Sequence, residues 1–144
     1  MIRTRRKSKK LVASIVILRA MERHQLISDV QELACRALSK LAINDRNSKK
    51  IGDARGIGVI LRAMERHELV PDVQEPACRT LSNLAVNDEN RKKIGEAGGI
   101  NVILRAMVRH QLFPDVQTQG CRGLCSLATS DDTKKQTRRS WHWV

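Results

Sequence analysis

The sequence predicts an all-α solenoid, a fold in which similar groups of helices stack side by side. The chain has 144 residues and repeats itself: residues 57–99 match the 43 residues before them at roughly 30 positions. The chain also has no Tyr, one Phe and two Trp. Aliphatic residues must therefore fill the interior, which favours packed helices over a β-sandwich.

Three repeats of this period divide the chain. They span residues 14–56, 57–99 and 100–131, between a basic tail of residues 1–13 and a second basic tail of residues 132–144. The third repeat departs from the pattern, because Gly120 and Gly123 stand where the second repeat has Ala77 and Thr80. Glycine weakens a helix by about 1 kcal/mol relative to Ala, so we expect this repeat to fray.

Each repeat is expected to contain three helices, of which the first is short. Within the bounds 57–99, this short helix is predicted over residues 88–96, with Asn87 as its N-cap. Gly98 and Gly99 then break the helix and allow a sharp turn. The second helix is predicted over residues 57–67. Its apolar residues recur at helical spacing on one face: Ile57, Ile60, Leu61 and Met64.

The third helix is predicted over residues 72–85. Asp72 and Glu75 resemble a capping box at its start, and Asp29 and Glu32 do so one repeat earlier. Pro76 should distort the first turn, because proline removes a backbone donor. The face expected to be buried carries residues at i, i+4, i+8 and i+11: Val73, Ala77, Leu81 and Leu84.

The formal net charge of +12 belongs mainly to the two tails. Ten of the 27 basic residues lie within residues 1–10 and 134–139, which leaves 17 bases against 15 acids in the body. We expect the first ten residues to be a disordered, solvated tail. A nuclear-import signal, a phosphate-binding arm or a start inside a longer protein are the alternatives.

Neither a secretion signal nor a membrane span is expected. Residues 11–18 follow the basic run and imitate the apolar core of a signal, but residues 16–24 recur as residues 59–67 in the middle of the chain. No stretch approaches 18 apolar residues.

Three of the four cysteines occupy one repeat position: Cys35, Cys78 and Cys121. Equivalent helices of stacked repeats lie about 8–10 Å apart, whereas a disulfide needs a Cα separation below about 7 Å. We therefore expect small buried thiols without disulfides. Free thiols suit a reducing compartment, so the expected localisation is the cytoplasm, the nucleus or both.

Three sequence motifs carry a family resemblance. The pattern V-Q-E-x-A-C-R-x-L-S-N-L-A, followed by N-D-E-N-R-K-K-I and A-G-G-I, resembles the armadillo repeat over residues 14–131. HEAT repeats are the nearest alternative. The resemblance implies three helices per repeat and a right-handed superhelix whose third helices line a concave groove. It also implies a scaffold role in which the groove binds an extended peptide or a partner protein.

The outward face of each third helix supplies the candidate binding residues. With Val73, Ala77, Leu81 and Leu84 buried, a helical period of about 100° per residue points Glu75, Arg79 and Asn83 away from the core. The positions equivalent to these three are Glu32, Arg36 and Lys40 in the first repeat and Thr118, Arg122 and Ser126 in the third. The residues predicted to bind a partner are Arg36, Lys40, Arg79, Asn83, Arg122 and Ser126.

The identity of these residues predicts the kind of partner. Import receptors of the importin-α branch carry Trp and Asn four residues apart on this helix, and here only Asn83 fits that pattern. The arginines at positions 36, 79 and 122 are more similar to the basic groove of the β-catenin branch. The nine outward residues hold four bases and two acids, which predicts a weak preference for acidic partners.

No metal, cofactor or catalytic activity is expected. His24, His67 and His110 each end a second helix, where an imidazole suits the helix dipole. Equivalent residues one repeat apart do not converge on one point, as zinc ligands must. Cys121 and Cys125 share a helix face but have no further ligand fixed nearby. No phosphate-binding Gly loop is present, and no carboxylate pair stands outside the repeat pattern.

Binding of a nucleic acid or an anionic surface is the alternative function. The basic tails and the Arg residues of the third helices favour it. Against it, proteins that bind single strands stack bases on aromatic side chains, and the repeats contain only Phe113. The chain is also consistent with a fragment of a longer solenoid, because neither end shows a complete polar cap.

Overall fold

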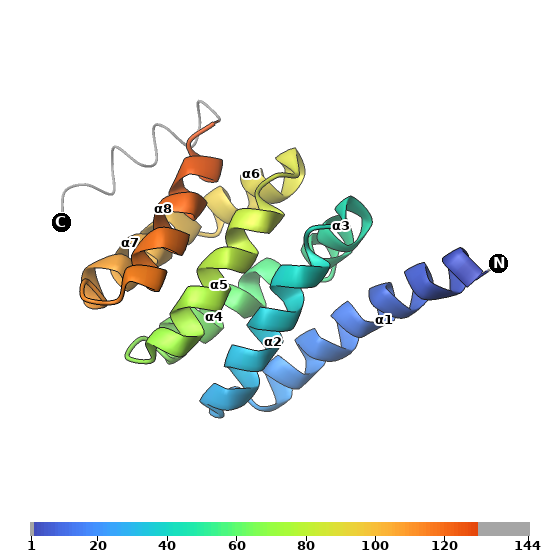
Figure 1. Ribbon diagram of the computed structural model, residues 1–144, viewed down its shortest axis with the longest axis horizontal. Helices are drawn as coiled ribbons and strands as arrows, with labels where there is room; N and C mark the ends of the chain where they lie inside the picture. Colours follow the sequence, from blue (N-terminus) through green and yellow to red (C-terminus); the bar gives the residue numbers. More distant parts are fainter. Residues whose placement is uncertain (1, 130–144) are drawn as a thin grey trace.

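A computed structural model describes residues 2–129 of the chain, and every regular element in that part is a helix. The elements follow the order α1 (Ile2–Arg23), α2 (Ser28–Leu41), α3 (Asp45–Asp53), α4 (Gly56–Arg66), α5 (Pro71–Leu84), α6 (Asp88–Glu96), α7 (Gly99–Arg109) and α8 (Pro114–Leu127) (Figure 1). The helices predicted over residues 57–67, 72–85 and 88–96 correspond to α4, α5 and α6.

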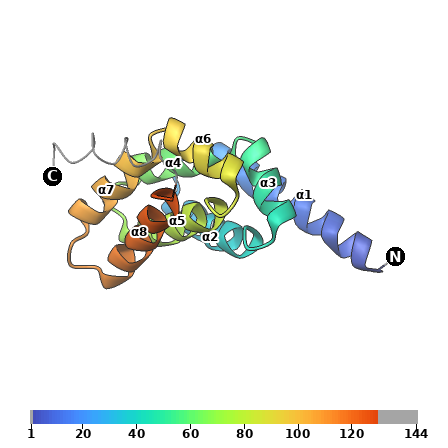
Figure 2. The same cartoon turned by 90° about the horizontal axis from the view of Figure 1, so that it is seen from above.

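The helices stack as an α-solenoid, which confirms the predicted fold class. The third helices α2, α5 and α8 lie side by side in one row, with α1, α4 and α7 behind them (Figure 1). From above, α2, α5 and α8 follow one side of the molecule and α4, α6 and α3 the other (Figure 2). The core lies between these layers. All four predicted core residues of α5 have no exposed surface: Val73, Ala77, Leu81 and Leu84.

A bend joins each short helix to the helix after it. Asn87 caps α6 as predicted, because its side chain accepts a hydrogen bond from the main-chain N–H of Asn90 at 3.0 Å. The chain then turns through a left-handed residue, Gly98 with φ 79°. At Gly99 a Cβ would lie 2.4 Å from the Cγ2 atom of Ile94, so the bend needs a residue without a side chain there.

Helix α1 lacks this bend, which corrects the expectation of a disordered N-terminal tail. Val12 and Ala13 occupy the positions of Gly98 and Gly99, and a β-branched residue strongly disfavours positive φ. Ser8 stands where Ile94 anchors α6 in the core. The first two helices of the repeat therefore merge into one straight helix that begins at Ile2. Whether a domain boundary falls at residue 13 stays a prediction.

The predicted capping boxes are wrong. Helix α5 begins at Pro71, one residue before Asp72, with Val70 as an N-cap whose side chain makes no capping bond. Proline favours the first helical position because its φ is already helical. Helix α2 likewise begins at Ser28, before Asp29, with Ile27 as its N-cap.

Pro76 lies in the second turn of α5, and the helix runs through it without a break. The main-chain carbonyl of Pro76 accepts a hydrogen bond from Thr80 Oγ1 at 2.8 Å. Whether Pro76 distorts the first turn of α5 stays a prediction.

Helix α8 continues through both of its glycines to Leu127. A Cβ at Gly120 would lie 2.5 Å from Met107 Cγ, so this glycine lets α8 approach α7 closely. Whether the third repeat frays in solution stays a prediction. The second basic tail, residues 132–144, lies outside the described residues.

Candidate functional site

The candidate groove is built on hydrogen bonds between neighbouring third helices. Thr80 Oγ1 of α5 lies 2.9 Å from the main-chain carbonyl oxygen of Cys35 in α2, and its one proton is shared between this carbonyl and that of Pro76. Asn83 Nδ2 donates to the carbonyl of Ser39, at 2.8 Å. These bonds fix α5 against α2, so the outward faces of the two helices form one surface.

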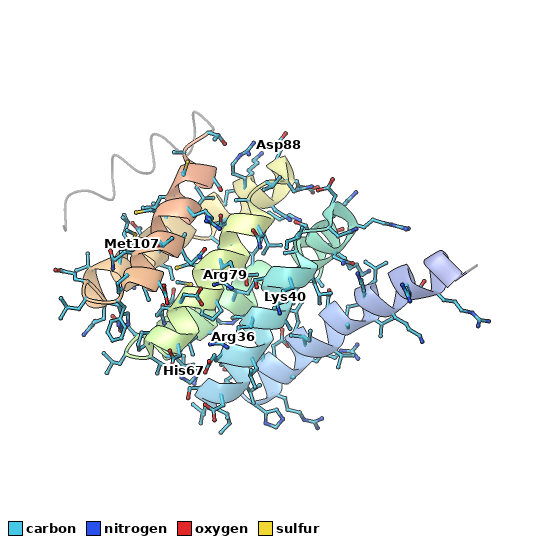
Figure 3. The ribbon with its side chains drawn as sticks, in the orientation of Figure 1. Arg36, Lys40, His67, Arg79, Asp88 and Met107 are labelled. Carbon is cyan, nitrogen blue, oxygen red and sulfur yellow. The ribbon has the colours of Figure 1, made fainter. Side chains whose placement is uncertain are left out.

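The six predicted binding residues share this surface but differ in exposure. Arg36, Lys40 and Arg122 are exposed, whereas Arg79, Asn83 and Ser126 are partly buried. Arg36, Lys40 and Arg79 lie on the same side of α2 and α5 (Figure 3). The helical period therefore placed these residues on the intended face.

Local ion pairs already occupy two of the arginines. Arg36 Nη2 lies 2.9 Å from Glu32 Oε1, and Arg79 pairs with Glu75 in the same i,i+4 arrangement. Thr118 replaces the acid in α8. Within residues 2–129, neither Arg122 nor Lys40 makes an ion pair. Lys40 and Arg122 are therefore the two basic residues of this surface without an ion-pair partner among the described residues.

Asn83 and Ser126 make hydrogen bonds within the fold. One donor of the Asn83 amide is used by Ser39, as described above. Ser126 Oγ donates to the main-chain carbonyl of Arg122 at 3.1 Å and lies 3.4 Å from Ser82 Oγ. Both residues therefore hold the groove together, whether or not they also contact a partner.

A second row of charges was not anticipated from the sequence. Asp29, Asp72 and Asp115 occupy one repeat position in the first turn of α2, α5 and α8, and all three are exposed. The D-V-Q motif of each repeat is the signal that could have revealed them. Aspartates are favourable at a helix N-terminus, so stabilisation of these helices is a sufficient explanation for all three.

An open hollow lies where the two rows meet. It has a volume of about 130 Å³ and includes Arg36 of α2, Asp72 and Glu75 of α5, and Asp115 of α8. Phe113 supplies an aromatic wall; its ring packs edge-on against His110, with a centroid separation of 5.7 Å. All three third helices contribute to this hollow, so an occupant would contact three repeats at once.

All four cysteines are free, but only two of the three at the shared repeat position are buried. Cys35 and Cys78 are buried, and burial raises the pKa of each thiol to about 12. Cys121 is exposed, contrary to the prediction, because no described helix packs on the side of α8 that corresponds to the α5–α8 junction. Cys125 is exposed as well.

The histidines tie one repeat to the next. His67 Nε2 donates to the main-chain carbonyl of Gln25 at 2.6 Å, and His110 Nε2 to that of Glu68 at 2.7 Å. A carbonyl can only accept, so Nε2 carries the proton in each bond. No group of three potential metal ligands occurs among residues 2–129.

A buried glutamine, Gln74, bonds to the C-terminal end of α4, and the sequence analysis did not identify it. Gln74 Nε2 donates to the carbonyls of Met64 and His67, at 3.1 and 2.8 Å. Gln31 and Gln117 repeat this arrangement in the other two repeats. The glutamine of the D-V-Q motif therefore closes the end of each second helix.

The chain matches a known family of repeats. The family described as the LRRK2 ARM repeat matches residues 3–142 of the chain. A search of curated proteins found none with significant similarity to the chain. Within the described residues, no helix is both long enough and apolar enough to cross a membrane.

Proposed function

The chain belongs to the armadillo-repeat family, whose members generally mediate protein–protein interaction, and on that premise we propose that its third helices bind a partner. The partner is an extended peptide or a protein segment that lies across α2, α5 and α8. One observation carries the proposal: the basic residues Arg36, Arg79 and Arg122 occupy one repeat position on three helices that pack side by side. The family's solenoid is a scaffold-type fold, and the proposed role is non-enzymatic.

The preference for acidic partners rests on Lys40 and Arg122 in this proposal. The carboxylates of Glu32 and Glu75 already neutralise Arg36 and Arg79. The aspartate row also offsets the basic row, so the surface as a whole is mixed rather than basic. We therefore propose that acidic side chains of the partner contact Lys40 and Arg122, and that the hollow beside Phe113 accepts an adjacent side chain.

A charge-reversal experiment tests this function. The Lys40→Glu, Arg122→Glu double variant should lose at least about tenfold in affinity for an acidic extended peptide selected from a library, which corresponds to about 1.4 kcal/mol. Arg62→Glu, Arg105→Glu is the matched control, because these exposed arginines occupy one repeat position on α4 and α7, outside the groove. Circular dichroism should show the same helicity for both double variants.

Equal peptide affinity for the groove variant and the wild type would reject the groove. Loss of affinity in the Arg62, Arg105 control alone would move the binding face to α4 and α7. Isothermal titration at two salt concentrations adds an independent readout, because contacts between exposed charges weaken as salt screens them.

A nucleic acid or an anionic surface is the second candidate, and α1 provides a specific observation for it. Arg5, Arg6, Lys9 and Lys10 are exposed on the first half of this straight helix. Binding to single-stranded DNA that weakens steeply with salt, and that is lost in the Arg5→Glu, Arg6→Glu variant, would support this candidate. Binding that survives this change but fails in Lys40→Glu, Arg122→Glu would assign the contact to the groove instead.

The cell compartment is also part of the proposal. All four cysteines are free, and two of them are packed in the core as reduced thiols. Such thiols are compatible with the reducing cytoplasm or nucleus. Fractionation of cells that express the chain with a fluorescent tag would test this localisation.

A further inference from the structure

We propose that copies of this chain associate head to tail, with the α1–α2 end of one copy packed on the α7–α8 end of the next. The interface would reproduce the junction that the chain already forms between its own repeats. This inference concerns the two ends of the solenoid and is independent of the groove.

The internal junctions define what such an interface contains. At each of them, side chains of the later repeat donate to main-chain carbonyls of the earlier one. His67 reaches the carbonyl of Gln25 and His110 that of Glu68, as described above. Arg109 also pairs with the Glu68 carboxylate at 2.8 Å. The two junctions share the histidine bond, whereas the ion pair has no counterpart at the first junction, because Gln25 stands at the position of Glu68.

The α1–α2 end carries the donor half of this junction, and no other element of the described part of the chain packs on it. Val16 is 56% exposed, whereas the equivalent Val59 and Val102 are 4% and 6% exposed. Leu33 is 63% exposed, although the residues at its position in α5 and α8, Pro76 and Gln119, are buried. His24 is exposed, while His67 and His110 use the same position to reach the preceding repeat.

The α7–α8 end carries the acceptor half, and no helix within residues 2–129 covers it. Cys121 and Ala128 are exposed, whereas Cys78 and Ala85 at their positions in α5 are fully buried. Leu124 is half-buried, although its counterpart Leu81 has no exposed surface. The carbonyl of Gln111 stands at the position of the Gln25 and Glu68 carbonyls, which accept the histidine bonds.

A second copy is the occupant that these two faces fit. Each face is one half of a junction whose other half lies at the opposite end of the same chain. A two-fold dimer would pair like with like, which neither internal junction does. The association is therefore heterologous and open-ended, and it should grow with concentration. It should be weaker than the stacking of the second and third repeats, because Gln111 replaces the acid that pairs with Arg109.

A mixing experiment with one-sided variants tests the proposal. Leu33→Glu blocks the α1–α2 end, and Cys121→Glu blocks the α7–α8 end. Sedimentation velocity in reducing buffer should show that the wild type grows beyond its 16.3 kDa monomer as concentration rises. Each variant alone should remain a monomer. An equimolar mixture should form a one-to-one dimer and nothing larger, because each variant keeps the half that the other lacks.

Val86→Glu is the matched control, because Val86 is an exposed aliphatic residue between α5 and α6, away from both ends. It should associate like the wild type. A wild type that stays monomeric would overturn the proposal, and so would a mixture that stays monomeric or single variants that self-associate like the wild type. If either variant loses helicity, Val16→Glu and Ala128→Glu block the same ends and must give the same pattern.

Discussion

Asn83 donates a hydrogen bond from its side-chain amide to the main-chain carbonyl of Ser39, one repeat earlier, at 2.8 Å. The same amide lies on the surface proposed to bind a partner. Asn83 therefore has a structural role that a helical wheel cannot reveal, because the wheel shows the direction of a side chain but not its neighbours. A loss of binding in an Asn83 variant must be separated from a loss of stacking.

Replacement of Asn83 by Ala should lower the free energy of unfolding by about 1 kcal/mol, because the carbonyl of Ser39 loses its bond to the adjacent repeat. Urea denaturation followed by circular dichroism measures the change. Ser126→Ala is the matched variant at the equivalent position, and it should cost less because Ser126 bonds mainly within its own helix. Equal stability of Asn83→Ala and the wild type would show that this bond contributes nothing to the stacking.

Two glycine substitutions should have opposite effects. Gly99→Ala should destabilise the protein by about 1–3 kcal/mol, because the new Cβ would lie 2.4 Å from Ile94 Cγ2 and 2.9 Å from the carbonyl of Ile94. Gly58→Ala should stabilise it by up to about 1 kcal/mol, because the nearest atom is the flexible end of Arg62 at 3.3 Å. Thermal melts of both variants provide the measurement. A neutral Gly99→Ala would mean that the bend after α6 can relax.

The thiols should divide into two classes in the folded protein. Cys121 and Cys125 should react with iodoacetamide within minutes, because both are exposed. Cys35 and Cys78 should react only when the chain unfolds. Peptide mass spectrometry after a short pulse of reagent, with a urea-denatured sample as the control, identifies the modified positions. Rapid modification of Cys78 in the native protein would contradict the packing of α8 on α5.

Stability should fall in alkaline solution. Burial raises the pKa of Cys35 and Cys78 from 9.0 to about 12, so the unfolded chain loses these protons first. The contribution is fully present below pH 9 and is lost as pH rises towards 12. The upper limit is about 1.4 kcal/mol per thiol between about pH 9 and pH 10. Denaturant titrations at about pH 8 and pH 10 should show the decline, and a Cys35→Ala, Cys78→Ala variant should show a smaller one.

The helical arrangement was predictable because it rests on strong periodic signals. The core positions Leu81 and Leu84 recur at helical spacing, and the paired Gly98 and Gly99 mark the bend. The starts of the helices were harder to predict. Asp72 is a residue type that often caps a helix, yet α5 already begins at Pro71. Periodicity describes what a side chain faces within a complete stack, so it also failed for Cys121, whose side of α8 no described helix covers.

The outward direction of the candidate residues could be predicted from the sequence, but their ion pairs and hydrogen bonds could not, and their role in binding stays a prediction. The face that carries Arg36 and Arg79 follows from the repeat, whereas the ion pairs depend on side-chain conformations that spacing alone does not determine. The histidine bonds join residues 42 positions apart, so they depend on how closely two repeats approach. The aspartate row was overlooked because its first-turn position has a sufficient explanation in helix stability.

The straight course of α1 has a mechanical consequence. The left-handed residues Arg55 and Gly98 lie at the bends between α3 and α4 and between α6 and α7, where they join a short helix to the next one. Helix α1 has no joint, so Arg5 and the core residue Leu18 belong to one rod and lie about 20 Å apart along it. A torque applied to the basic tip is therefore transmitted directly to the first layer of the core, instead of being absorbed by a hinge.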